Sequence, residues 1–425
     1  MIRRLRKAIA ISLIVILVLT AAEIIWLPII RIIQVPFGWT TQVVDSEDSV
    51  GLGNSIAVDS SGCLHISYYD ITKKDLKYAK LTDGEWQIET VDSAGNVGHY
   101  SSIAVGSDGC VHISYCDYAY SNLKYAKFAD GRWLVETIAS EDDVGFYTSI
   151  ALDTNGHPHI SYHDGTNKDL KYIRLTDNGW VKETVDSDGD IGVDTSIALD
   201  SNDHPHISYC DKGNEDLKYA KLTESGWITE TIDSEGSVGW DTSMALDSKD
   251  YPHISYFCNN NLDLKYARLT EEGWLIETVD SRGDIGRNPS ITIDSNNHPH
   301  LAYWDLTLYH LKYAKFVEGK WFVEIVDLEG AVGWSQTITL DSNDHPHIAY
   351  CDYIKQNLKY ATREDSSSSE EVPLQDKYSL IIRFPQVRLP WSKVIGIVAI
   401  GIAIELVIAW MLSWTFKVTR KQKVD

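Results

Sequence analysis

Between its two ends, the 425-residue chain has no stretch with the 3.6-residue periodicity of an amphipathic helix, which excludes a helical architecture for that part. Positive charge is also scarce: the chain has 38 Lys and Arg but 61 Asp and Glu, and its net charge is −23. Residues 1–36 carry +4 and residues 366–425 carry +3, so the middle of the chain carries −30. A surface this acidic repels phosphate backbones, and we expect no nucleic-acid partner.

Apolar and aromatic residues are plentiful instead. Apolar residues make up 44% of the chain, which excludes disorder for most of it, and there are 14 Trp and 23 Tyr. An acidic, aromatic-rich middle between two basic, apolar ends indicates an anchored extracytoplasmic domain.

Residues 1–36 predict an export signal and a membrane anchor. The sequence MIRRLRK is followed by a long apolar run, which places the basic residues in the cytoplasm. Thr20-Ala21-Ala22 has the small residues of a cleavage site, but the apolar character continues to Val35. We therefore favour an uncleaved signal-anchor over a cleaved signal peptide, since about 20 apolar residues span a bilayer.

A second apolar run, over residues 393–416, predicts a transmembrane helix, and residues 417–425 predict a basic cytoplasmic tail. Basic residues flank this helix on both sides, so the N-terminal signal decides the orientation. Residues 366–392 form a juxtamembrane linker, in which KYSLIIRF fits either a strand or an interfacial segment. The expected location is the cell membrane, with the middle of the chain on the extracytoplasmic side.

Glu23 and Glu405 lie inside the two apolar runs, where a charged carboxylate costs about 2–3 kcal/mol or more. One hypothesis is that they contact each other's helix or the helix of a transmembrane partner. The other is that Glu23 lies at the membrane interface, or at a new N-terminus after cleavage.

A 47-residue repeat fills the middle of the chain. Seven copies follow one another without an insertion or deletion, and they carry Trp from Trp39 to Trp321, His from His65 to His347 and Gly from Gly51 to Gly333. Leu-Lys-Tyr triplets keep the same spacing. Repetition of this length indicates one supersecondary unit per copy.

Each copy contains four strand-like runs separated by turn-rich segments. In residues 180–226 the runs are WVKETVD, SIALD, HISYCD and DLKYAKL. Four short strands in about 40–50 residues predict the blade of a β-propeller. The array begins with a Trp strand and ends with a Leu-Lys-Tyr strand, so the N-terminal strand should complete the last blade as its outermost strand. We predict an all-β, seven-bladed propeller over residues 37–365.

With PHISYxD followed by DLKYA in its repeats, the array resembles the seven-bladed propellers of predicted secreted and surface-anchored prokaryotic proteins. The resemblance covers residues 39–362 and implies the fold. It leaves the function open, because propellers host lectins, hydrolases, lyases and scaffolds.

The repeated histidine opens the second strand, and six copies place His or Cys two residues before it, as in Cys63/His65 and His157/His159. Residues i and i+2 share a strand face, so each pair offers two ligands for zinc or copper, but a third ligand is missing. We expect a structural histidine bonded to Ser and Asp groups, and neither a metal nor a cofactor. The turn DSDGDIG (186–192) resembles part of a calcium loop, but a turn with Gly51 and its equivalents at positive φ explains all seven copies.

The cysteines are expected to be mostly buried free thiols. Cys116, Cys210 and Cys351 recur at one position in non-neighbouring copies, too far apart to pair. Cys63 and Cys110 occupy equivalent turns of adjacent copies and form the one plausible disulfide.

Departures from the repeat concentrate in two predicted loops: the three residues after the repeated Gly, and the residue after the repeated Tyr of the second strand. Both positions should lie on the same face of the ring, and by analogy with other propellers that face carries the binding site. The candidate ligand-binding residues are His99, Tyr100, Phe146, Tyr147, His163, Asp194, Trp240, Asp241, Arg287, Asn288, Trp304 and Trp334. Aromatic side chains beside carboxylates suit sugar rings or a basic peptide, and ordinary loop variation without a ligand is the alternative.

The favoured function is a non-catalytic binding module for a glycan, an envelope polymer or a protein. A structural or assembly subunit of a membrane complex is the alternative, supported by Glu23 and Glu405. A sialidase-like glycoside hydrolase has less support, because LTDGEW and LTESGW lack the full spacing of an Asp-box and no arginine cluster is present. A hydrolase with paired carboxylates needs two acids about 5–9 Å apart, and so many repeated acids single out no pair. We therefore expect no enzymatic activity.

Overall fold

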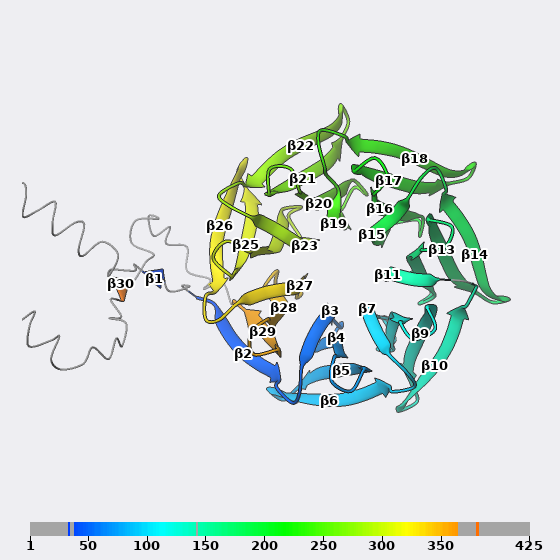
Figure 1. The fold of residues 1–425 in the computed structure, drawn as a ribbon, viewed down its shortest axis with the longest axis horizontal. Helices are drawn as coiled ribbons and strands as arrows, with labels where there is room; N and C mark the ends of the chain where they lie inside the picture. The colour runs from blue at the N-terminus through cyan, green and yellow to red at the C-terminus, as the bar shows by residue number, and fades with distance from the viewer. Residues whose placement is uncertain (1–32, 35–37, 142, 364–379, 382–425) are drawn as a thin grey trace, which may run out of the picture. The chain divides into compact units, whose positions relative to one another are not determined.

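The computed structural model describes residues 38–141 and 143–363, together with Ile33–Gln34 and Leu380–Ile381. Residues 38–363 form seven four-stranded sheets arranged as blades around a centre (Figure 1). Within each blade all strand pairs are antiparallel, and the innermost strand lies nearest the centre of the ring (Figure 1). The predicted all-β, seven-bladed propeller is confirmed.

The blades follow one another in chain order. Blade 1 contains β3 (Val50–Val58), β4 (Leu64–Asp70), β5 (Asp75–Thr82) and β6 (Glu85–Asp92), and blade 2 contains β7 (Val97–Val105), β8 (Val111–Asp117), β9 (Asn122–Ala129) and β10 (Arg132–Ala139). Blade 3 contains β11 (Val144–Leu152), β12 (Pro158–Asp164), β13 (Asp169–Thr176) and β14 (Gly179–Asp186), and blade 4 contains β15 (Ile191–Leu199), β16 (Pro205–Asp211), β17 (Asp216–Thr223) and β18 (Gly226–Asp233). Blade 5 contains β19 (Trp240–Leu246), β20 (Pro252–Cys258), β21 (Asp263–Thr270) and β22 (Gly273–Asp280), and blade 6 contains β23 (Ile285–Ile293), β24 (Pro299–Asp305), β25 (His310–Val317) and β26 (Lys320–Asp327). Blade 7 contains β27 (Val332–Leu340), β28 (Pro346–Asp352), β29 (Asn357–Thr362) and the N-terminal strand β2 (Thr40–Asp45).

The N-terminal strand closes the ring as predicted. Strand β2 pairs antiparallel with β29, with Thr40 opposite Thr362, and so becomes the outermost strand of blade 7. On the other side of this blade, the backbone N–H of Val50 in β3 donates to the carbonyl of Gln356 at 2.9 Å. Because the first strand and the last three share one sheet, the array has no open edge between its first and last copies.

The hydrophobic core lies between consecutive blades. Leu358 and Tyr360 of blade 7, for example, form one buried cluster with Ile56, Ile66 and Tyr68 of blade 1. The second strand of each blade is buried along its whole length, apart from the half-buried His347 in β28, because both of its faces meet protein. The repeated Trp of each outer strand donates its Nε1–H to a side chain of the preceding outer strand, as Trp227 does to Glu183 at 2.9 Å.

A buried carboxylate links most neighbouring blades. Asp280, at the end of β22, accepts hydrogen bonds from the hydroxyl of Tyr303 at 3.0 Å and from the ammonium of Lys312 at 2.8 Å, both in the next blade. Burial raises the pKa of Asp280, but these donors outweigh burial and leave the pKa below its usual value. Equivalent contacts are made by Asp45, Asp92, Asp186, Asp233 and Asp327.

The repeated glycine allows the blades to approach closely. Gly98 has φ +103°, and a Cβ there would lie 2.8 Å from the Cα of Leu76 in the preceding blade. All seven glycines from Gly51 to Gly333 have the positive φ that was expected for them, including Gly192 of the DSDGDIG segment.

All six cysteines are free, which contradicts the suggested Cys63–Cys110 disulfide. The Cys63 thiol instead donates to the carbonyl of Leu81 at 2.7 Å. Cys116, Cys210, Cys258 and Cys351 are buried, as expected for structural thiols.

The predicted membrane segments lie outside the described residues, apart from Ile33–Gln34. Strand β1 (Ile33–Gln34) pairs antiparallel with β30 (Leu380–Ile381) in a second unit of the chain, so part of KYSLIIRF is a strand. Across the described part of the chain, no helix is long and apolar enough to cross a membrane.

Replacing the buried carboxylate should destabilise the propeller strongly. We expect Asp280→Ala to lower the free energy of unfolding by about 3–5 kcal/mol, because it leaves the Lys312 charge buried without its partner. Denaturant unfolding of the full-length protein measures this loss. The matched control is Arg282→Ala. The Arg282 side chain is 75% exposed and lies 3.3 Å from the same carboxylate, so its removal should cost less than about 1 kcal/mol. Equal losses in the two variants would contradict the role of the buried contact.

Candidate functional site

The two variable positions meet on one face of every blade. Strand register places His99 opposite Cys116, Phe146 opposite His163 and Arg287 opposite Trp304. The first residue after the repeated Gly therefore lies beside the residue after the repeated Tyr, as the sequence predicted.

The variable triplets lie within strands, which corrects their prediction as loops. Strand β11, for example, begins at Val144 and includes Phe146 and Tyr147. The register shifts between Phe146 and Ser149, so two residues oppose one on β12, which is a β-bulge. The bulge and the glycine interrupt the alternating pattern by which a strand is identified in a sequence, and only the short run after the triplet shows that pattern.

The bulge gives the middle residue of each triplet a left-handed backbone. The φ angles of these seven residues lie between +47° and +55°, at Gly53, Tyr100, Tyr147, Asp194, Asp241, Asn288 and Ser335. Such a conformation costs a tyrosine on the order of 1 kcal/mol or more. Because all seven copies share it, the backbone belongs to the fold, and only the side chain that it presents differs from blade to blade.

A first aromatic cluster covers this face of blades 1–3. The His99 ring lies between Tyr69 and Tyr118, with ring centroids 4.0 and 4.8 Å away. Tyr118 also contacts Phe146 at 6.1 Å. Tyr100 contacts Phe146 at 6.2 Å and Tyr147 at 4.7 Å. These six residues are called the blade 1–3 cluster below.

A second aromatic cluster lies on blades 6 and 7. Trp304 and Trp334 stack with ring centroids 6.4 Å apart, and Trp334 meets Tyr353 edge-on at 4.8 Å. Tyr309 lies 6.3 Å from Trp304. These four residues are called the blade 6–7 cluster.

Two acids occupy the middle positions of blades 4 and 5. The Asp194 carboxylate accepts the backbone N–H of Asp241 at 2.9 Å, and the Asp241 carboxylate accepts the backbone N–H of Asn288 at 3.1 Å. Both side chains are half-buried. Burial, and then the neighbouring Asp241 carboxylate, raise the pKa of Asp194 to about 7. Burial also raises the pKa of Asp241.

Four predicted candidates are buried or held by local contacts. His163 is buried and donates its Nδ1–H to the carbonyl of Ile191 at 2.8 Å, and Trp304 is the buried member of its cluster. Trp240 donates its Nε1–H to the Ser237 hydroxyl at 2.9 Å. Arg287 is half-buried, with its Nε 2.9 Å from Asp284 and its guanidinium 4.4 Å from the Phe257 ring centroid.

The candidate list of the sequence analysis lacks four aromatic residues of this face: Tyr69, which occupies the second variable position, and three tyrosines outside both variable positions. Tyr118, Tyr309 and Tyr353 follow the second strand of blades 2, 6 and 7, and about half of each side chain is exposed. They are departures from the repeat like the triplets, so the same comparison of copies could have found them.

The repeated histidine is structural, as expected, but one of its expected partners was wrong. His65 Nδ1 lies 2.6 Å from the hydroxyl of Tyr78, and Nε2 lies 3.2 Å from Asp59. Since a carboxylate accepts only, Nε2 carries the proton and Tyr78 donates to Nδ1, the role that the sequence analysis gave to Ser. Burial lowers the pKa of the equivalent His112, His159, His206 and His300 to about 4, so these rings are neutral. Asp59, Cys63 and His65 offer ligand atoms within 4.8 Å of one another, but each side chain already has a protein partner.

A comparison of the sequence with descriptions of known protein families and with curated proteins gives no match. Solved structures share the architecture. A polysaccharide lyase of a new family, an ulvan lyase bound to -[GlcA(1-4)Rha3S]-, aligns with a TM-score of 0.50 and 14% identity over 77% of this chain and 95% of that chain. Hydrazine synthase from Kuenenia stuttgartiensis aligns with a TM-score of 0.51 and 9% identity over 73% of this chain and 95% of that chain. At these identities the similarity shows the propeller fold alone.

The acid pair should make the stability of the propeller depend on pH. With the pKa of Asp194 raised to about 7, the folded state keeps a proton that the unfolded state releases above about pH 4. The free energy of unfolding should therefore fall as the pH rises from about 4 to about 7, and Asp194→Asn should remove this part of the decline.

Denaturant unfolding across this pH range measures the effect. Asp188→Asn is the matched control, because Asp188 is exposed and lies in the turn before the first strand of blade 4. Its stability should follow that of the wild type across the pH range. Parallel curves for the wild type and Asp194→Asn would contradict the assignment.

Proposed function

We propose that this protein is a membrane-anchored, cell-surface propeller. It binds a glycan or envelope polymer on the face that carries the variable triplets and does not catalyse a reaction. One observation carries the proposal: two aromatic clusters, each with an exposed tyrosine, lie on the face where the copies differ most.

The internal repeat separates scaffold from site. Residues present in every copy meet a need of every blade, as the glycines and the buried Tyr and Lys do. A single ligand requires a departure from this symmetry, and the departures are aromatic in blades 1–3 and 6–7 and acidic in blades 4 and 5.

The side chains of this face suit a polyhydroxylated ligand. Aromatic rings cover the apolar face of a ligand while a few polar groups fix its orientation. Tyr118 is 52% exposed and Tyr353 is 48% exposed, so each ring keeps a free edge or face although it packs against its cluster. Asp194 and Asp241 add hydrogen-bonding carboxyl groups, and burial, which raises the pKa of both, favours hydroxyl groups over cations as their partners.

A glycoside hydrolase is the second candidate, favoured by the same acid pair. A carboxyl group with a raised pKa beside a second one is the arrangement that general acid catalysis uses. Binding without chemistry is the better supported function, because both carboxylates accept backbone N–H groups of the next blade and so have a structural role.

Membrane attachment is part of the proposal and rests on the two apolar runs of the sequence. An assembly role, with Glu23 and Glu405 meeting a transmembrane partner, remains the alternative to ligand binding.

Binding of the full-length, detergent-solubilised protein to glycans and envelope polysaccharides tests the proposal. We expect Tyr118→Ala and Tyr353→Ala each to weaken binding about five- to tenfold, since an aromatic contact contributes about 1 kcal/mol. Tyr120→Ala is the matched control, because this tyrosine follows Tyr118 by two residues and is 73% exposed.

Failure of the wild type to bind any polymer would overturn the glycan proposal and favour the assembly role. Release of shortened sugars by the wild type, lost in Asp194→Asn, would establish the hydrolase instead.

A further inference from the structure

One of the seven interfaces lacks the buried carboxylate that the others share. The outer strand of blade 2 ends in Ala139, where the equivalent residue of every other copy is Asp. The backbone is unchanged, because Ala139 pairs with Leu123 just as Asp92 pairs with Leu76, with the same register shift before it. Blade 2 therefore lacks only the side-chain carboxylate, and its outer strand keeps the same pairing.

The two groups that bind the carboxylate elsewhere are both present in blade 3. Tyr162 is 3% exposed, and its hydroxyl has no hydrogen-bond partner among the described residues. Lys171 turns to its own blade, with Nζ 2.8 Å from Asp169 and 2.8 Å from the Thr184 hydroxyl. In the other copies, the corresponding Tyr hydroxyls lie 2.7–3.0 Å from an Asp oxygen.

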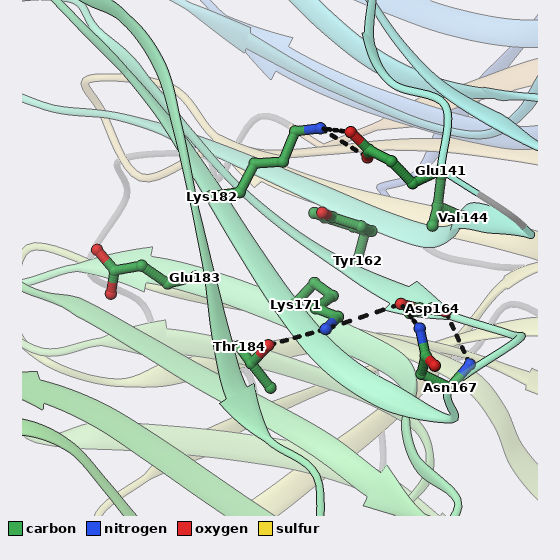
Figure 2. A pocket seen from close by; sticks show the side chains of 9 residues that line it. All are labelled: Glu141, Val144, Tyr162, Asp164, Asn167, Lys171, Lys182, Glu183 and Thr184. Carbon is green, nitrogen blue, oxygen red and sulfur yellow. Dashed lines mark hydrogen bonds and ion pairs between the residues drawn. The ribbon is translucent and has the colours of Figure 1, made fainter.

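A pocket of about 230 Å³ lies beside these two groups, and Tyr162 and Lys171 both line it (Figure 2). Figure 2 shows Lys171 between Thr184 and Asp164, while no interaction is drawn to Tyr162. The volume is below the roughly 300–1,000 Å³ of sites for drug-sized ligands, so it suits a molecule no larger than a single sugar acid.

A second departure adds a cation at the same place. Lys182 lines the pocket, and the equivalent residues of the other copies are uncharged: Thr41, Ile88, Val135, Thr229, Ile276 and Val323. Its ammonium lies 2.7 Å from Glu141, whose side chain is 72% exposed. The loss of an anion at position 139 and the gain of a cation at position 182 both favour the binding of an anion from solution.

The remaining acids do not prevent this. Asp164 lies 3.7 Å from Lys171 and also accepts a hydrogen bond from Asn167 at 2.9 Å. In blade 6, the equivalent Asp305 lies 3.4 Å from Lys312 while the same lysine binds Asp280. An added carboxylate thus has the same acidic neighbour as in an intact interface. Glu183 is directed elsewhere, since it accepts the Trp227 Nε1–H.

We propose that the pocket at the blade 2–3 interface binds a small carboxylate, whose carboxyl group takes the place of the missing aspartate side chain. It accepts hydrogen bonds from the Tyr162 hydroxyl and the Lys171 ammonium, and Lys182 lies nearby on the pocket wall. None of the residues that line this site belongs to the variable triplets, and the proposal does not depend on the function proposed for the variable face.

Calorimetric and thermal-shift titrations of the full-length protein with acetate and glucuronate test the proposal, with glucose and chloride at matched ionic strength as controls. We expect both carboxylates to bind and to raise the thermal midpoint, and neither control to do so. Ala139→Asp should raise the midpoint without ligand and abolish carboxylate binding, because it restores the seventh aspartate.

Tyr162→Phe provides an independent test that keeps the ring. It should weaken carboxylate binding about tenfold, the effect of losing one hydrogen bond to a charged group. Tyr115→Phe is its matched control, since the Tyr115 hydroxyl donates to Asp92 at 2.8 Å, and it should leave the affinity unchanged. No carboxylate binding by the wild type, or binding that survives in Ala139→Asp or Tyr162→Phe, would overturn the proposal.

Discussion

A buried aspartate, present at six of the seven interfaces between blades, is the contact on which most of the propeller depends. It ends the outer strand of one sheet and accepts hydrogen bonds from the second and third strands of the next, so at these six interfaces it fixes a blade relative to the one before it. Burial of the carboxylate is unfavourable, and the tyrosine and lysine donors offset that cost. Because the inner strand of the next blade begins a few residues later, the same contact also positions the strand that carries the variable residues.

The variable face follows from two backbone features rather than from loops. The repeated glycine brings each inner strand against the preceding blade, at a distance that no Cβ could occupy at Gly98 without a shift. The bulge that follows then presents one side chain from each blade in a left-handed conformation. Since this geometry is the same in every copy, tyrosine, aspartate, asparagine, serine and glycine are all accommodated there. The propeller thereby keeps its packing constant while the chemistry of the face changes.

Most departures from the repeat inside the core are compensated. Ser67 meets Ser101 at 2.9 Å, and Ser161 meets Thr195 at 2.9 Å in an equivalent contact between blades. Where the serine becomes Ala302, the partner becomes Gln336, which is long enough to reach the backbone carbonyl of Arg287 at 3.0 Å. Pro289 lacks this compensation and leaves the Ser255 hydroxyl buried without a partner among the described residues. Ala139 belongs to this second kind, because it leaves the Tyr162 hydroxyl without the carboxylate that the other copies supply, and Tyr162 lines a pocket.

The sequence by itself determined the fold, because a 47-residue period, four strand-like runs per copy and the phase of the array leave one way to close the ring. It also determined which residues are scaffold, since seven copies within one chain act as their own comparison. It did not determine the partners of the repeated histidine, because Tyr78 and Asp59 reach His65 only through strand pairing and turn geometry. The tertiary structure alone decided that His163 and Trp304 are buried, how Tyr118 and Tyr353 pack into the two clusters, and that the Asp241 carboxylate raises the pKa of Asp194. These properties depend on how closely side chains of neighbouring blades approach one another. Local sequence patterns do not contain these distances.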